Sequence, residues 1–286
     1  MAKPNAATDA ADMPAATPSR NLMLRVVSSA VLAPLAIGIA YLGGWPFAIF
    51  WTIAAVAVWW EWTKLVHPSG HIGALVTGIS ALLIQMFLLM NHREDVAVMI
   101  AGLGGLAAAI ISARKALWTA AGVIYASVLL IAPVMIRGES FTGFIAIMFL
   151  FAVVWGTDIV AYFTGRAIGG PKLAPAISPN KTWSGAIGGL IGAVAGGAAI
   201  VMPSNVKAFL AIAAIAIALS IASQAGDLFE SRMKRLFNVK DSGALIPGHG
   251  GVMDRLDGFV TAVLLALVIG VAIAGWNSPA PGLIGW

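Results

Sequence analysis

Long apolar runs separated by short polar connections make up most of this chain. About nine of the runs are long enough to cross a bilayer, which takes about 20 residues (range 17 to 25). They lie near 22–43, 46–64, 72–90, 96–112, 116–136, 141–163, 183–203, 207–229 and 258–276. The pattern therefore predicts an all-α fold, a polytopic transmembrane helical bundle of about nine spans.

The polar segments divide the chain. Residues 1–19 are rich in Ala, Pro, Thr and Asp without an apolar period, which predicts a disordered tail. Residues 20–140 carry the first five predicted spans, and residues 141–286 carry the last four. The two longest polar connections, 164–182 and 230–257, both fall in the second region. Any chemistry is therefore expected in the C-terminal transmembrane region.

The distribution of Lys and Arg predicts the orientation of the spans. With the N-terminus inside, alternation places fourteen of the 17 basic residues on the cytoplasmic side and leaves Arg93, Arg137 and Lys207 outside. Cytoplasmic loops of membrane proteins carry such an excess of positive charge. We therefore expect a cytoplasmic N-terminus, an outside C-terminus and a cytoplasmic position for both long polar connections.

Composition agrees with a membrane protein. Hydrophobic residues make up 60% of the chain and charged residues only 10%, and the mean hydropathy is +0.93, whereas soluble domains carry roughly 25% charged residues. Cysteine is absent, which excludes disulfides and thiolate metal sites. Membrane topology and anionic lipid headgroups account for the net charge of +5. Nucleic acid is therefore not an expected partner.

One polar stretch, residues 223–258, concentrates charge within this apolar chain. It holds five of the twelve acids and five of the seventeen Lys and Arg residues. Asp227, Ser231 and Lys234 recur at helical spacing, so they line one face of a helix with Glu230. An acid at a span end that faced lipid would cost a few kcal/mol. We therefore expect a polar cavity here, with a solvated helix end as the plain alternative.

The end of this stretch supplies the other parts of a phosphate site. Asp254 and Asp257 stand three residues apart just before the last span, preceded by a glycine-rich loop with His249, Gly250 and Gly251. Glycines let backbone amides approach phosphate oxygens, and carboxylates without cysteine favour Mg²⁺. Nearby cations are Lys234, Arg235, Lys240 and Arg255. This combination is typical of phosphoryl or nucleotidyl transfer.

The connection 164–182 supplies a second set of candidates. Asp158 lies inside a span just before it, and an intramembrane acid is a functional candidate by default. Residues 178–182 precede a predicted helix and include Lys181. A helix N-terminus with an adjacent lysine can bind an anion, although ordinary capping explains the same residues.

Other features of the spans have structural explanations. Glycines spaced by four residues in 183–203 predict close helix packing. The tryptophans of 46–64 are expected to be interfacial anchors. Glu61 beside Lys64 is either a buried acid or, as we favour here, half of an interfacial ion pair.

Three motifs of the chain resemble those of a known family. The run Ser231–Asp257, S-x-M-K-R-x4-K-D-x-G-x2-I-P-x-H-G-G-V-x-D-R-L-D, resembles the signature of phosphatidate cytidylyltransferases. The segment SPNKTWSG and the spacing of Asp158, Tyr162 and Arg166 resemble two further motifs of that family. The resemblance covers residues 155–260, whereas the N-terminal spans match only in hydropathy.

The resemblance implies a Mg²⁺-dependent enzyme that joins CTP and phosphatidic acid to give CDP-diacylglycerol and pyrophosphate. It implies a bacterial-type inner membrane, a site facing the cytoplasm and a homodimer. Asp227 and Asp254 match the expected metal ligands. The catalytic residues expected on this basis are Asp227, Asp254, Asp257, Lys234 and Arg235. The expected substrate-binding residues are Asp158, Lys181, Ser231, Lys240, Asp241, His249, Gly250, Gly251 and Arg255.

Two alternative functions stay open on the sequence. A CTP-dependent polyprenol or phytol kinase has the same chemical needs, but it also requires a base for the hydroxyl nucleophile. A small transporter predicts acids spread through the middle of several spans. Apart from Asp158 and Glu61, the acids in or beside the spans instead cluster at the cytoplasmic end of the last spans.

Overall fold

The computed structural model describes residues 18–113, 115–202, 209–239, 241–243, 245 and 250–285, with side chains from residue 30 onward. The described residues form ten helices and one two-stranded hairpin. The helices are α1 (Pro18–Leu42), α2 (Gly44–Val66), α3 (Ile72–Leu89), α4 (Glu94–Ser112), α5 (Ala116–Arg137), α6 (Phe141–Ile168), α7 (Trp183–Val201), α8 (Phe209–Leu236), α9 (Met253–Ala274) and α10 (Ala280–Ile284). Almost all of the predicted tail 1–19 lies outside the described residues.

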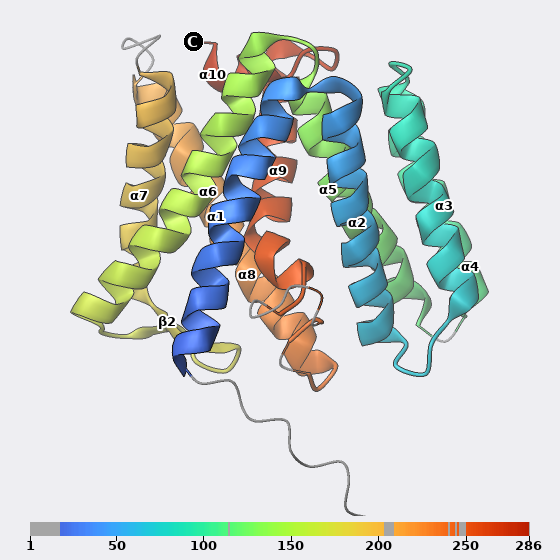
Figure 1. Cartoon of the computed structure of the whole chain (residues 1–286), viewed down its shortest axis with the longest axis horizontal. Coiled ribbons are helices and arrows are strands. Elements are labelled where there is room, and N and C mark those ends of the chain that lie inside the picture. The colour runs from blue at the N-terminus through green and yellow to red at the C-terminus, as the bar shows by residue number, and fades with distance from the viewer. Residues whose placement is uncertain are drawn as a thin grey trace, which may run out of the picture.

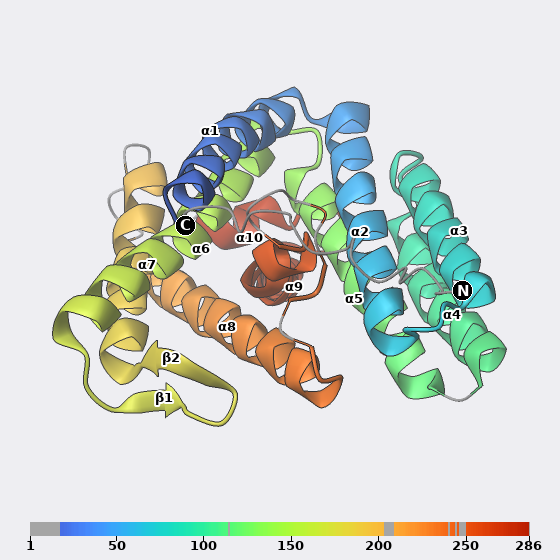
Figure 2. The same ribbon diagram turned by 60° about the horizontal axis from the view of Figure 1, so that its bottom comes forward.

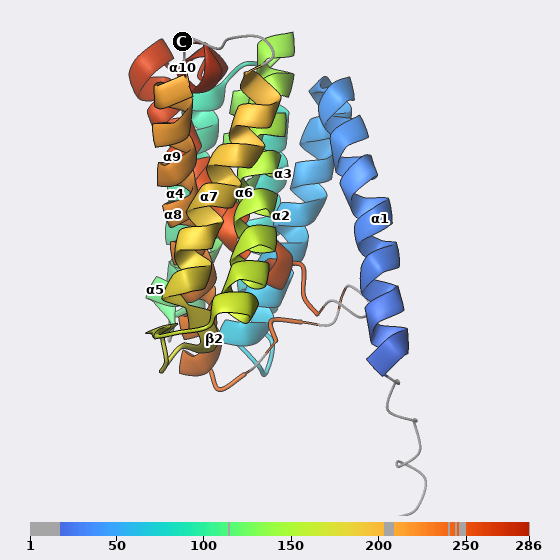
Figure 3. The same cartoon turned by 90° about the vertical axis from the view of Figure 1, so that its left-hand side faces the viewer.

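The nine long helices run alongside one another and alternate in direction (Figure 1). The start of α1, the β-hairpin and the start of α9 lie at one end of the bundle, which we call the hairpin end, and α10 lies at the opposite end. In Figure 3, α1 lies along the edge of the bundle. The two long polar connections were predicted to lie on one side of the membrane. Their described parts thus lie at one end of the bundle.

Seven of the described helices, α3 to α9, are long and apolar enough to cross a membrane, so the chain is an integral membrane protein. Among the described residues α1 contributes only the shorter apolar stretch Ala30–Leu42. The all-α bundle is therefore confirmed, whereas the span count of nine and the orientation of the two termini stay predictions.

Helices α6 and α7 pack closely through glycine. A Cβ atom added to Gly196 would lie 2.6 Å from the carbonyl oxygen of Ala152, and Gly192 lies equally tightly against Gly156. Only residues without a side chain allow two backbones this approach. The close packing expected from the glycine spacing is confirmed.

Three tryptophans of α2 belong to the core, which corrects their interpretation as interfacial anchors. Trp51, Trp59 and Trp62 are 2%, 0% and 1% exposed. The Trp59 indole donates to the carbonyl of Leu75 at 3.0 Å, and Trp51 stacks on Phe259 of α9 with ring centroids 5.0 Å apart. Because α2 packs onto α9, the N-terminal helices help to hold the helix that carries Asp254.

The connection after α6 folds as an antiparallel hairpin of β1 (Lys172–Ala174) and β2 (Ser178–Thr182). The sequence did not predict it, since prolines such as Pro175 and Pro179 disfavour strand interiors. Both strands are short and have no further partner in the sheet, which is where proline is tolerated. The Thr182 hydroxyl accepts the N–H of Gly185 at 3.1 Å, so the expected capping of α7 is present.

Two helices extend beyond the predicted spans. Helix α6 runs to Ile168, past the span end expected at 163. Helix α8 runs to Leu236, past the span end expected at 229, so that Asp227 and Lys234 lie on one helix as their spacing predicted. The polar ends of these helices therefore remain helical and present their side chains at fixed spacing.

Candidate functional site

Helices α8 and α9 cross closely at the hairpin end through two glycines. A Cβ atom on Gly258 would lie 2.6 Å from Oδ1 of Asp227, and one on Gly226 would lie 2.5 Å from the backbone oxygen of Asp257. Such separations are too short for a real side chain. The glycine pair therefore brings Asp227 and Asp257 side by side on neighbouring helices.

The hairpin places a cation at this pair of acids. Lys181 on β2 donates to Oδ2 of Asp227 at 2.7 Å, and both side chains are partly exposed. Figure 2, which looks from the hairpin end, shows β1 and β2 beside α8, with α9 nearer the centre of the bundle. The two polar segments, 46 residues apart at this contact, thus build one site.

Asp158 and Arg255 extend the group. Asp158, on the exposed part of α6, interacts electrostatically with Asp257, Lys181 and Arg255. Asp227 in turn interacts with Asp257 and Asp158. Carboxylates that interact with one another in this way repel unless a cation or a proton compensates their charge. The arrangement can therefore hold cationic groups between its acids.

Asp254 lies in a second, more enclosed group. Its Oδ1 accepts from the Lys234 ammonium at 2.6 Å, and its Oδ2 accepts from the N–H of Gly251 at 2.9 Å and from the N–H and hydroxyl of Ser242 at 3.1 and 2.9 Å. Lys234 also lies 3.6 Å from the buried carboxylate of Glu230. Asp254 and Asp257 share the first turns of α9, as predicted, and Glu230 and Lys234 of α8 interact with both of them.

Glu61 of α2 is the residue that sequence reasoning placed wrongly. It is fully buried and accepts from the N–H groups of Val252 and Met253 at 3.0 and 2.8 Å. Lys64, its predicted partner, instead lies over the ring of Trp60, 3.5 Å from its centroid. The signal available in the sequence was an acid within an apolar run, which by default is functional.

The remaining predicted residues lie around these two groups. Gly250 has φ +83°, a backbone conformation that favours glycine. Ser231 is half-buried on α8, whereas Arg235, near the end of α8, and Asp241, in the loop after it, are exposed. The two others predicted, Lys240 and His249, lie outside the described residues.

The carboxylates of the candidate site suit Mg²⁺, because carboxylate oxygens are the ligands that this ion prefers. Within the described ranges, no three His, Asp or Glu side chains are already arranged around one metal position. Lys181 and Lys234 are instead the counter-ions of Asp227 and Asp254. A metal ion at either predicted ligand would share that carboxylate with a lysine.

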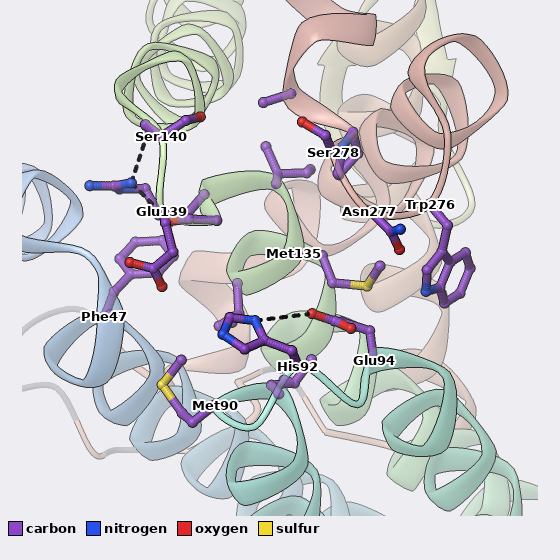
Figure 4. Close-up of a pocket in the computed structure, with 18 residues that line it drawn as sticks. Phe47, Met90, His92, Glu94, Met135, Glu139, Ser140, Trp276, Asn277 and Ser278 are labelled. Atoms are coloured by element: carbon purple, nitrogen blue, oxygen red, sulfur yellow. Dashed lines mark hydrogen bonds and ion pairs between the residues drawn. The ribbon is translucent and has the colours of Figure 1, made fainter.

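A separate cavity of about 310 Å³ lies at the end opposite the hairpin. In Figure 4 the ion pair of His92 and Glu94, 4.0 Å apart, faces the cavity from one wall, and Glu139 lies across from it. Trp276, Asn277 and Ser278 also line the cavity. None of the predicted site residues lines this cavity.

Comparison with known proteins covers most of the chain. The model of the cytidylyltransferase family matches residues 23–272. A phosphatidate cytidylyltransferase of Brucella suis biovar 1 is 41% identical over 261 residues, which cover 91% of this chain and 97% of that protein. The protein of the same name from Brucella abortus biovar 1 is 42% identical over 256 residues, covering 89% and 95%. The one from Haemophilus influenzae is 42% identical over 133 residues, 44% of this chain and 45% of that protein.

Proposed function

Because this chain belongs to the cytidylyltransferase family, we propose that it transfers the cytidylyl group of CTP to phosphatidic acid. The products are CDP-diacylglycerol and pyrophosphate. The observation that carries the proposal is the 2.7 Å contact of Lys181 with Asp227. It joins the two polar segments into one site of carboxylates and cations at the end of a membrane bundle.

The chemistry requires charge compensation more than a base. The second pKa of a phosphate monoester is about 6, so the lipid phosphate is largely ionised near neutral pH. One of its oxygens attacks the α-phosphorus of CTP, and the bond from that phosphorus to the oxygen bridging to the β-phosphate breaks. Two anions must meet for this step. Lys181, Lys234 and Arg255 supply positive charge at the site, which stabilises the attacking and leaving phosphates.

Mg²⁺ is part of the proposal, with Asp227 and Asp254 as the ligands predicted from the sequence. We propose that Asp257, which lies beside Asp227 across the glycine crossing, assists these ligands. A bound Mg²⁺ would neutralise phosphate charge. The protein's own part is to hold the carboxylates and lysines that flank the substrates.

We further propose that the protein lies in a bacterial-type inner membrane and that the hairpin end faces the cytoplasm. The bias of Lys and Arg toward that end supports the orientation. A cysteine introduced at exposed Lys172 should react with a membrane-impermeant maleimide only after the cells are opened. Labelling of intact cells would contradict the orientation.

A homodimer is the further expectation from the family resemblance. Crosslinking of the purified protein in detergent and in lipid vesicles tests it. A species of twice the monomer mass is expected in both, and a monomer under all conditions contradicts it.

Incubation of the purified protein with phosphatidic acid vesicles, Mg²⁺ and CTP labelled at the α-phosphorus tests the reaction itself. Label should enter the lipid fraction while unlabelled pyrophosphate is released. A lipid kinase would transfer only the γ-phosphate, so label from γ-labelled CTP in lipid would refute the proposal. The comparisons give no support to the lipid-kinase or transporter alternatives.

A further inference from the structure

We propose that Glu61 of α2 is a positioning residue for the transfer reaction. It holds the start of α9 and the adjoining loop residues in the geometry that places Asp254. This inference deepens the proposed function and rests on it. It also assigns a role in the site to the N-terminal helices, which the sequence motifs do not reach.

The first observation is that Glu61 caps α9 from a distant part of the chain. The first N–H groups of a helix have no partner within the helix, and Val252, at the N-cap position of α9, provides no side-chain cap. The Glu61 carboxylate accepts from the N–H of Val252 at 3.0 Å and from that of Met253 at 2.8 Å. A negative charge at this end also interacts favourably with the helix dipole.

The second observation links Glu61 to the acid of the signature. The Ser242 hydroxyl lies 3.2 Å from Oε2 of Glu61 and 2.9 Å from Oδ2 of Asp254. A hydroxyl has one proton, so it can donate to only one of these carboxylates at a time. A change at Glu61 therefore alters the hydrogen bonding of Asp254, whose other oxygen holds Lys234.

The third observation is that two signature glycines leave room for this carboxylate. A Cβ atom on Gly243 would lie 2.5 Å from Oε1 of Glu61, and one on Gly251 would lie 2.6 Å from Oε2. The loop is thus shaped around an acid that arrives from α2. A buried charge is tolerated only when it is hydrogen-bonded, and Glu61 is fully buried.

The test compares the full-length protein with its Glu61→Gln variant in lipid vesicles, using the α-labelled CTP assay. Glutamine preserves the volume, but it replaces one acceptor oxygen with an N–H₂ group that faces a backbone donor. The matched control is Gln85→Leu, which removes another fully buried polar contact, to Ser127 at 3.0 Å, in the same N-terminal helices.

Glu61→Gln should lower kcat on the order of 10²-fold, since misplacement of a reacting group by about 1 Å costs this much. The KM values for both substrates should stay within about threefold, because ground-state binding is retained. Glu61→Asp, which keeps the charge, should recover part of kcat. Amide hydrogen exchange at Val252 and Met253 should accelerate in Glu61→Gln but not in Gln85→Leu.

A Glu61→Gln protein whose kcat matches that of Gln85→Leu, or whose Val252 and Met253 amides keep their protection, would overturn the proposal. If Glu61→Gln does not fold, Ser242→Ala decides instead. The proposal expects it to lower kcat at least about tenfold, and unchanged kcat overturns the proposal. An inactive wild-type protein in the same assay would refute the proposed function itself, which separates the two failures.

Discussion

A single methyl group at the crossing of α8 and α9 should reduce catalysis more than stability. In Gly258→Ala the new Cβ would lie 2.6 Å from Oδ1 of Asp227 and 2.5 Å from the hydroxyl of Ser223. The nearest backbone atom, the carbonyl oxygen of Ser223, lies 3.1 Å away. The close neighbours are thus side chains that can turn aside, while the helices need to move only slightly.

The size of the effect follows from these separations. Asp227 must move its carboxylate by about 0.5 to 1 Å to reach an ordinary van der Waals distance. A displacement of about 1 Å at a reacting centre can cost 10²-fold in rate, so kcat should fall about ten- to a hundredfold. Overpacking costs about 1–3 kcal/mol, and the better helix propensity of alanine offsets about 0.5–1 kcal/mol of it. The free energy of unfolding should therefore fall by about 0–2.5 kcal/mol.

The assay measures α-labelled cytidylyl transfer to phosphatidic acid, with thermal unfolding in the same detergent as the stability readout. Gly102→Ala is the matched control, because a Cβ at this helical glycine of α4 meets no atom within 4 Å. It should keep wild-type activity. Equal turnover by Gly258→Ala and Gly102→Ala would show that the crossing does not position Asp227.

Three further predictions concern the cations of the site. Lys181→Met should lower kcat/KM on the order of 10²-fold, whereas Lys172→Met, at an exposed position on the other strand of the hairpin, should leave activity unchanged; equal effects in steady-state kinetics would remove Lys181 from the site. Lys234→Met leaves Asp254, whose side chain is 9% exposed, without its counter-ion, which should destabilise the protein by about 3–5 kcal/mol; an unfolding curve that matches wild type would contradict this. Chelation by EDTA should abolish lipid labelling and added Mg²⁺ should restore it, and turnover that persists in EDTA would exclude the metal requirement.

Local patterns predicted much of the fold because they depend only on neighbouring residues. The apolar runs locate the helices, since an apolar stretch in lipid must satisfy its backbone internally. The glycine spacing of α7 predicted close packing, and Gly192 and Gly196 fit tightly against α6. The hairpin at 172–182 was missed because prolines obscure strand propensity and pairing with a second strand is not a local property.

The candidate site likewise combines features that local sequence predicts with contacts that depend on packing. Local sequence was enough to identify the polar residues that are available, namely Asp227, Asp254 and Asp257 with their lysines, because charge is costly in an apolar chain and is kept where it is compensated. The contacts between these residues could be found only in the folded protein. Lys181 reaches Asp227 through a hairpin, and Glu61 reaches the start of α9 from 191 residues away. Such contacts depend on how helices that are distant in sequence pack together. The spacing of residues along the chain does not encode this packing.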